Sequence, residues 1–299
     1  MKSIKIGNQE LLIKDYYCSD GTGYYPRDDG KLWLYANLTD VCNGYCPFCI
    51  NPGKKTGNSP FDLLQFKKML ERVKEHVYGI SLTGGEPMLV PGLIDEVAEA
   101  VMESLGWDVE LDMVTNGFDL ERIADLRYLE NFCSIHVSKH MLSDEDNDRL
   151  FGFHTVSWDG LKRLINSLKD PGAIVLNCVI MKDGIDTLEK AEEYLERASY
   201  AGVQNVSFIG MSICNQFCES HYVDPKSLKL GKSKPFYIWS QYNDHDFCSC
   251  QSGSYQAEAR NIRYYIRSMG KGRASYTRQL VYTADNKLLA GFGGKEILF

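Results

Sequence analysis

The sequence predicts an α/β fold, a partial (βα)6 barrel of the TIM type with a small cysteine-containing C-terminal extension. Apolar, β-rich segments alternate with amphipathic helical segments between residues 31 and 211. Parallel strands need crossover connections, and the intervening helices supply them. Six strands are too few to close an eight-stranded barrel, so the sheet is expected to stay open.

The expected strands are short, rich in β-branched and aromatic residues, and end at turn residues. They span residues 31–39, 78–87, 108–117, 132–140, 173–184 and 203–212. The helices between them are expected at residues 59–77, 93–105, 120–129, 159–169 and 187–202. Ser59 is the expected cap of the first helix, because apolar residues follow it at helical spacing.

The pattern changes after the sixth strand. Residues 213–258 are polar, a helix is expected over 255–269, and 278–293 is expected to form a hairpin that turns at Asp285–Asn286. These changes predict three parts: an N-terminal extension, the partial barrel and a C-terminal extension with a possible auxiliary metal site. They cover residues 1–30, 31–212 and 213–299.

Composition narrows the class of protein. The chain has 299 residues, of which 44% are hydrophobic and 24% charged, as expected for a soluble globular protein. No apolar run approaches the ~20 residues that span a bilayer, and the N-terminus lacks the apolar core of a signal peptide. A cytoplasmic location is therefore expected. The net charge of -7 and the lack of a basic tract argue against nucleic acid as a partner.

Three cysteines follow the first expected strand. Cys42, Cys46 and Cys49 have the spacing C-x3-C-x2-C. In a reducing compartment, clustered thiols favour metal over disulfide. Four thiolates would close a zinc site or an ordinary iron–sulfur cluster, whereas three leave a coordination position open.

Several polar or glycine-rich motifs also follow strands. The cysteine loop, "GGEP" (84–87), "TNG" (115–117) and "SKH" (138–140) each follow an expected strand. In parallel α/β architectures the chemistry lies beyond the C-terminal ends of the strands, so these motifs are expected to meet on one rim.

These residues resemble the signature of radical S-adenosylmethionine (radical SAM) enzymes. The resemblance rests on the cysteine triplet, the aromatic Phe48 before its last cysteine, and "GGEP", which begins 35 residues after Cys49 on the next strand. It implies that the three thiolates hold three irons of a [4Fe–4S] cluster and that the fourth iron binds SAM. Reductive cleavage of SAM would then give a 5′-deoxyadenosyl radical that abstracts hydrogen from a substrate. A flavodoxin- or ferredoxin-type electron donor is implied as a partner.

The resemblance also implies a SAM site at matching positions. Gly84 and Gly85, with Glu86, would receive the amino group of SAM, because glycine permits close approach of the backbone. The remaining positions would lie near the carboxylate, ribose and adenine of SAM. They are Thr115, Asn116, Ser138, Asn177, Ile209 and Gly210. "TNG" can also be read as a plain turn, and Ser138 as a helix cap.

Within the family, the chain most resembles the branch of the molybdenum-cofactor GTP cyclases and their relatives with SPASM or twitch extensions. "LTDVCNGYCPFC" and "LVYTADNKLL" carry this likeness. The cyclases use arginines and cysteines around the C-terminal hairpin for GTP and an auxiliary cluster. Here Gln279 and Val281 replace the arginines, and Thr277 and Gly291 replace two of the cysteines. The departures argue against GTP as substrate.

Four further cysteines follow the sixth expected strand. They are Cys214, Cys218, Cys248 and Cys250. They could hold an auxiliary iron–sulfur cluster, bind zinc, or be unliganded thiols. Cys133 and Cys178 lie in expected strands and are interpreted as core residues, and His140 is a site candidate by its location, as is His245.

The leading functional hypothesis is therefore a radical SAM enzyme. Its substrate is expected to be a small molecule, because only about 30 residues precede the first strand, whereas peptide-modifying relatives usually carry an added N-terminal recognition domain. A peptide substrate is the alternative. A non-catalytic iron–sulfur or zinc protein is a third hypothesis, and "GGEP" argues against it because an electron carrier needs no SAM site.

Overall fold

The six expected strands all form, and they pair in chain order as parallel neighbours. The protein is represented by a computed structural model that describes residues 2–13, 30–50, 61–228, 230, 235–238, 251–267, 277 and 279–299. The six strands are β3 (Leu32–Thr39), β4 (Val77–Gly84), β5 (Glu110–Thr115), β6 (Ser134–Ser138), β7 (Ile174–Ile180) and β8 (Asn205–Gly210). The predicted α/β class with a parallel sheet is confirmed.

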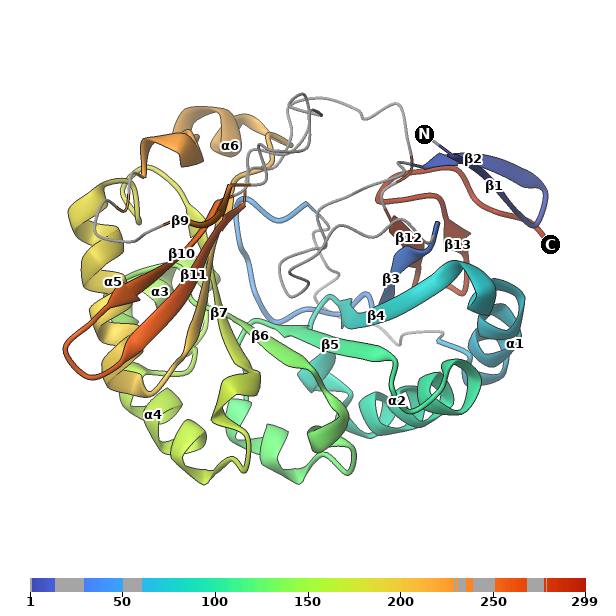
Figure 1. The fold of residues 1–299 in the computed structure, drawn as a ribbon, viewed down its shortest axis with the longest axis horizontal. Helices are drawn as coiled ribbons and strands as arrows, with labels where there is room; N and C mark the ends of the chain where they lie inside the picture. The colour runs from blue at the N-terminus through green and yellow to red at the C-terminus, as the bar shows by residue number, and fades with distance from the viewer. Residues whose placement is uncertain are drawn as a thin grey trace.

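Helices cover the outer side of the curved sheet, while the strands line its inner side (Figure 1). The helices are α1 (Leu63–Val73), α2 (Pro91–Leu105), α3 (Asp144–Phe151), α4 (Trp158–Ser167), α5 (Leu188–Ala201) and α6 (Gln216–His221). Short 3-10 turns connect several elements: η1 (Lys74–His76), η2 (Pro87–Leu89), η3 (Leu120–Asp125), η4 (Leu129–Asn131), η5 (Pro171–Ala173) and η6 (Pro225–Ser227). One hydrophobic core joins the inner faces of the helices to the sheet.

The sheet extends beyond the six predicted strands on both edges. β12 (Gln279–Tyr282) pairs parallel to β3, and β11 (Asn261–Arg267) pairs parallel to β8. Antiparallel strands then complete the sheet, which has 11 strands within the described residues. They are β13 (Leu288–Leu289), β10 (Gln251–Gln256) and β9 (Pro235–Ile238). Strands from the C-terminal part of the chain therefore border the barrel on two sides. A separate two-stranded sheet pairs β1 (Lys2–Ile6) with β2 (Gln9–Ile13).

The helix predicted over 255–269 is wrong, because most of this segment forms the hairpin of β10 and β11. Ile262 and Ile266 are four residues apart, which also fits a helix. Tyr264 between them is buried as well, while Arg263 is exposed, so the burial alternates with the period of a strand. The predicted C-terminal hairpin does form, and Asn286 adopts φ +66° in its turn.

Other predicted elements differ in detail. Residues 120–129 form 3-10 turns rather than a full helix. Asp62 caps α1, since its carboxylate accepts from Leu64 N and Gln65 N, while Ser59 lies outside the described residues. Cys178 is a core residue as predicted, but Cys133 is exposed.

Residues alternate between the helix-covered face and the inner face of the sheet. Phe208 of β8 packs against Tyr194 of α5, with ring centroids 5.7 Å apart, so it points outward. Ser207 and Ile209, its neighbours on β8, therefore point inward. The inner face carries the polar side chains of the barrel, and it is the face that meets the rim motifs.

The described part of the chain contains no helix that is both long and apolar enough to cross a bilayer.

Candidate active site

The cysteine loop leaves β3 at the C-terminal rim of the sheet and folds around its own thiols. Gly44 N lies 3.3 Å from the Sγ of Cys42 and donates to it. Cys49 N donates to the backbone oxygen of Cys46 over 3.2 Å. Cys42, Cys46 and Cys49 are all half-buried. The three thiols thus share one short, internally bonded loop at the rim.

The glycine turn after β4 packs directly on the start of this loop. Gly85 N donates to Thr39 O over 2.6 Å, and Glu86 N donates to Val41 O over 2.9 Å. A Cβ at Gly85 would lie 2.1 Å from Val41 O, and Gly84 adopts φ +135°. Glycine is required at both positions for this contact between two loops, whatever else the turn binds.

Glu86 connects the glycine turn to the end of β5. Its side chain is only 1% exposed. Oε1 accepts from Met88 N at 2.9 Å and from the Thr115 hydroxyl at 2.7 Å, and Oε2 accepts from Asn116 N at 2.7 Å. Burial raises the pKa of Glu86 to about 7, against the lowering effect of the three hydrogen bonds. The carboxylate therefore joins two adjacent strand ends.

Asn116 extends this connection to the cysteine loop. Its Nδ2 donates to Asn43 Oδ1 over 2.9 Å and lies 3.9 Å from the Sγ of Cys42. Its Oδ1 accepts from Phe118 N over 2.9 Å, which closes the local turn that the Asn-Gly pair predicts. "TNG" is therefore both a turn and a contact of the cysteine loop.

Helix α3, which the sequence analysis did not predict, holds the other side of the cysteine loop. Phe151 O, at the end of α3, accepts from Tyr45 N over 2.7 Å. The helix begins at Ser143, whose hydroxyl accepts from Asp146 N, and ends at Gly152 with φ +79°. The Ser-x-x-Asp cap and the following glycine are signals that could have predicted it.

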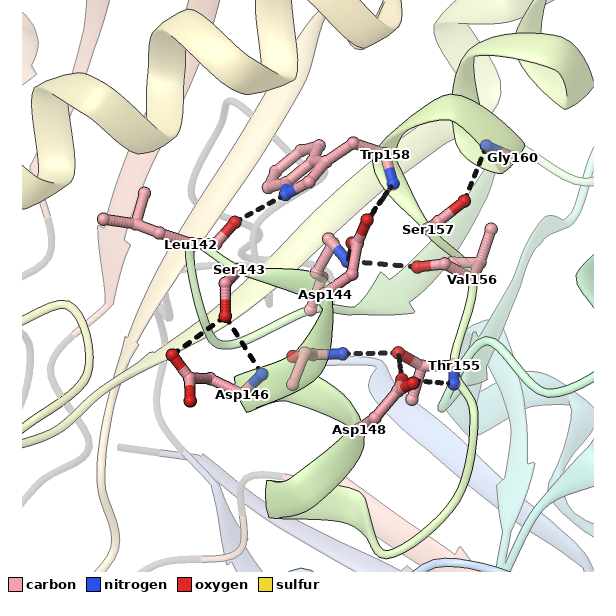
Figure 2. A network of polar contacts seen from close by, with 12 residues as sticks. Leu142, Ser143, Asp144, Asp146, Asp148, Thr155, Val156, Ser157, Trp158 and Gly160 are labelled. Atoms are coloured by element: carbon pink, nitrogen blue, oxygen red, sulfur yellow. Dashed lines mark hydrogen bonds and ion pairs between the residues drawn. The ribbon is translucent and has the colours of Figure 1, made fainter.

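A polar network fixes α3 relative to α4 (Figure 2). Asp148 accepts from both the backbone and the hydroxyl of Thr155, at 2.7 and 2.8 Å. Trp158 Nε1 donates to Leu142 O over 2.8 Å. The ammonium of Lys139, buried at 0% exposure, donates to Asp144 at 2.6 Å and to Val156 O at 3.0 Å. This network fixes the position of Phe151 and so that of the cysteine loop.

His140 lies in an aromatic cluster next to the cysteine loop. Its ring stacks on Phe151 with centroids 5.2 Å apart and meets Phe48 edge-on at 5.1 Å. Nδ1 accepts from Val179 N over 3.1 Å. Burial lowers the pKa of His140 to about 3, so the ring is neutral near pH 7.

A chain of buried polar side chains crosses the inner face from β5 to β7. The Ser134 hydroxyl donates to Asp112 over 2.8 Å and contacts His136 Nε2 at 2.9 Å. His136 Nδ1 contacts Asn177 Oδ1 at 3.1 Å. Of these residues, Asn177 alone was predicted from the sequence as a site residue. Polar residues at alternate positions of apolar strands were the signal for the other members of the chain.

The other predicted SAM-site positions lie on the same rim. Ser138 ends β6 and pairs with Asn177, so it caps no helix. Ile209 is half-buried and Gly210 is buried at the end of β8. The structure thus brings eight of the nine predicted positions to the C-terminal ends of β4, β5, β6 and β8, while Asn177 lies in the middle of β7, level with Ser138 at the end of β6.

Two of the four additional cysteines lie beside the cysteine loop. Cys214 Sγ and Cys218 Sγ are 3.5 Å apart, and Cys214 Sγ is 3.9 Å from Cys49 O. Asn215, the cap of α6, donates from Nδ2 to Pro47 O over 2.8 Å. Cys248 and Cys250 lie outside the described residues, as do Cys18 and His245.

The residues of the cysteine loop fit a cluster better than a single ion. Within the described residues, no three His, Cys, Asp or Glu side chains gather as a single-ion site would require. A cluster binds each thiolate to a different iron, so the thiols need not converge on one point. Asn43 Nδ2 is buried in this loop without a hydrogen-bond partner in the described part of the chain, and such a donor suits the sulfurs of a cluster.

An open parallel sheet with three thiols and a glycine turn joined at one rim defines a class of metal-dependent α/β enzyme. A family model for the radical SAM superfamily matches residues 36–198, which is more than half of the chain. The chain therefore belongs to the radical SAM superfamily. Enzymes of this family use a [4Fe–4S] cluster and SAM.

Curated relatives resemble part of the chain. It is 30% identical over 160 residues to a GTP 3′,8-cyclase of Rippkaea orientalis, covering 50% of this chain and 47% of the relative. It is 29% identical over 184 residues to a probable GTP 3′,8-cyclase of Saccharolobus solfataricus, covering 59% and 56%. The chain thus spans about half the length of the curated relatives it matches.

A solved structure shares the fold over most of the chain. SuiB of Streptococcus suis, crystallised with S-adenosylmethionine, superimposes with a TM-score of 0.58 at 16% identity. The match covers 88% of this chain and 60% of SuiB. It supports the partial barrel that the sequence predicts.

The Glu86 contacts predict a pH-dependent stability. The pKa of Glu86 is about 7 in the folded protein and ordinarily 4.5, so folding favours the protonated form. Stability from this group is therefore greatest below about pH 4.5, falls as pH rises to about 7, and is constant above. Glu86→Gln removes this dependence. We expect the unfolding free energy of wild type minus that of the variant to fall by about 3 kcal/mol between pH 5 and 8.

Urea denaturation of both cluster-free proteins at the two pH values measures this difference. Glu103→Gln, an exposed substitution on α2, is the control and should keep a constant difference from wild type. A difference for Glu86→Gln that stays constant, or grows with pH, would show that Glu86 is not held in this way.

Proposed function

We propose that this protein reductively cleaves SAM at a [4Fe–4S] cluster bound by Cys42, Cys46 and Cys49, and abstracts hydrogen from a small-molecule substrate other than GTP. The observation that carries the proposal is the direct hydrogen bonding of the cysteine loop to the glycine turn, Gly85 N to Thr39 O and Glu86 N to Val41 O. A thiol site serving electron transfer alone would have no use for a glycine turn built against it.

The residues of the rim take distinct roles in this proposal. The three thiolates hold three irons and leave the fourth for the amino and carboxylate groups of SAM. When bound, the cluster supplies the electron for SAM cleavage, and a flavodoxin- or ferredoxin-type protein is the proposed donor to it. The backbone of Gly84 and Gly85 receives the amino group. Glu86 acts mainly as a positioning residue, because its carboxylate already accepts three hydrogen bonds.

The remaining positions surround the rest of SAM. Thr115, Asn116 and Ser138 lie toward its carboxylate and ribose, Asn177 toward the ribose, and Ile209 with Gly210 toward the adenine. Asn177 is supported in this role by its contact with His136, which orients its amide on the inner face. Phe48 and His140 form an apolar wall beside the loop that keeps water away from it.

The identity of the substrate is the finer part of the proposal. The curated relatives named above are GTP cyclases, yet the two hairpin positions that resemble their arginines are neutral here. Gln279 and Val281 alternate with the buried Leu280, and they pair with Trp33 and Tyr35 of β3. A neutral edge of this kind gives no charge-assisted bonds to a triphosphate. A peptide substrate is the second candidate, which rests on the family alone.

The cluster assignment makes a direct prediction. Replacing Cys42, Cys46 and Cys49 together with alanine should abolish SAM cleavage and the SAM-dependent EPR signal of the reduced cluster, because no thiolate remains at the rim site. The replacement Cys133→Ala, at an exposed cysteine just before the N-terminal end of β6 and so at the end opposite the rim, is the control and should keep both. Survival of either property in the triple variant would disprove the assignment.

The substrate assignment predicts that the purified, reconstituted protein does not turn GTP into a cyclised product. Product would be measured by chromatography and mass spectrometry after incubation with SAM, reductant and GTP. A Gln279→Arg/Val281→Arg variant tests the reason: it should bind GTP at least about tenfold more tightly than wild type, since each arginine adds charge-assisted bonds. Cyclisation of GTP by the wild type would show that the proposal is wrong.

A second metal site, most simply an iron–sulfur cluster, is proposed at Cys214, Cys218, Cys248 and Cys250. Its support is the 3.5 Å separation of the first two sulfurs beside the cysteine loop. A metal bound by all four thiols would tie together the two cysteine pairs, which are about 30 residues apart in the sequence. Zinc and unliganded thiols are the alternatives.

Metal content separates these alternatives. We expect about eight irons per wild-type chain and about four in the Cys248→Ala/Cys250→Ala variant, because each [4Fe–4S] cluster contributes four. Iron and zinc would be measured by mass spectrometry after anaerobic reconstitution. About four irons in both proteins would overturn the second cluster, and accompanying zinc would identify the site as a zinc site.

A further inference from the structure

Two buried polar groups on adjacent strands have unmet hydrogen-bonding capacity. Within the described residues, neither Nε nor Nη2 of Arg267 on β11 has a hydrogen-bond partner, and neither does the hydroxyl of Ser207 on β8. Ser207 is 0% exposed. Nearly all buried polar groups in native proteins are satisfied, so these exceptions require an explanation.

The pairing of the strands places both groups on the inner face of the barrel. Arg267 pairs with Ile209, and Tyr265 pairs with Ser207, in a parallel register. Paired residues of neighbouring strands point to the same face. Because Phe208 points outward to α5, the residues on either side of it, and their partners on β11, point inward.

Arg267 also lies at the C-terminal end of its strand, where the rim motifs lie. It is the last residue of β11, which runs parallel to β8, and so it reaches the same rim as Ile209 and Gly210. β11 lies one strand beyond the sixth barrel strand, on the side away from β3 and its cysteine loop. Arg267 therefore lies next to the proposed adenine positions, on the side of β8 away from β7.

A guanidinium with its Nε and Nη2 groups buried without partners is costly to the folded protein. Its five N–H donors form a rigid fork that matches a carboxylate or a phosphate. A ligand oxyanion would satisfy these donors with two parallel, charge-assisted bonds. The Ser207 hydroxyl, two residues back along the inner face, offers a second polar contact to the same molecule.

We propose that Arg267 binds an oxyanion of the substrate, a carboxylate or a phosphate, and thereby sets the orientation of the substrate above the barrel. The identification of the ligand as a substrate rests on the proposed function, but the oxyanion site itself does not depend on SAM cleavage. It assigns the anionic contact to β11 rather than to the β12–β13 hairpin, whose inward positions are neutral.

The test measures anion binding by thermal unfolding of the reconstituted holoenzyme with SAM present, so that the proposed SAM site is already filled. Inorganic phosphate and acetate are the two probes, each titrated against chloride at equal ionic strength. The unfolding midpoint of wild type should rise with at least one probe and saturate. The probe that acts identifies the class of oxyanion.

Three variants locate the effect. Arg267→Met keeps the apolar stem and removes the fork, so the anion concentration that gives half of the midpoint shift should rise at least about tenfold. Without anion, this variant should unfold at a higher temperature than wild type. Arg263→Met is the matched control, four residues earlier on the same face and exposed, and it should respond like wild type. Arg267→Lys, which keeps the charge but loses the fork, should respond only weakly.

A wild type that responds to neither probe, or an Arg267→Met variant that responds as strongly as wild type, would overturn the inference. SAM cleavage by the same wild-type preparation is assayed in parallel. An anion response without SAM cleavage would refute the proposed function and leave the oxyanion site standing. SAM cleavage without an anion response would refute the oxyanion site and leave the proposed function standing.

Discussion

The buried carboxylate of Glu86 is the interaction on which the arrangement of the rim depends. It accepts hydrogen bonds from its own turn and from Thr115 and Asn116 at the end of the next strand. Asn116 in turn contacts the cysteine loop. One acidic side chain thus links the glycine turn to the end of β5, and through Asn116 to the thiol loop. Its burial desolvates the charge, which is why its pKa is raised to about 7.

Contacts from the later helices α3 and α6 hold the cysteine loop from its other sides. Phe151 O binds Tyr45 N, and Asn215 at the start of α6 binds Pro47 O. Behind Phe151, the buried Lys139 joins α3 to the start of α4 through Asp144 and Val156. A loop of three cysteines that must hold a fixed spacing is therefore supported by backbone and side-chain bonds from four separate segments, which is a form of preorganisation.

Much of the fold could be predicted because the signals are local. The six parallel strands follow from apolar segments separated by helical ones, and the rim motifs follow those strands. The β11 strand was predicted as a helix, because Ile262 and Ile266 fit both periods. For the site, the residues within the sequence motifs could be predicted, but their contacts could not. The Glu86 bonds, the chain from Asp112 to Asn177 and the unsatisfied Arg267 depend on strand register, which a single sequence does not specify.

The proposal that three thiolates leave one iron open for SAM at this rim has a direct spectroscopic test. Hyperfine spectroscopy of the reduced cluster with SAM labelled with 15N at its amino group tests it most directly. Direct binding predicts a clear 15N coupling to the cluster, which is replaced by a 14N coupling when unlabelled SAM is used. A cluster that forms, is reduced and shows no such coupling with saturating SAM would contradict the account.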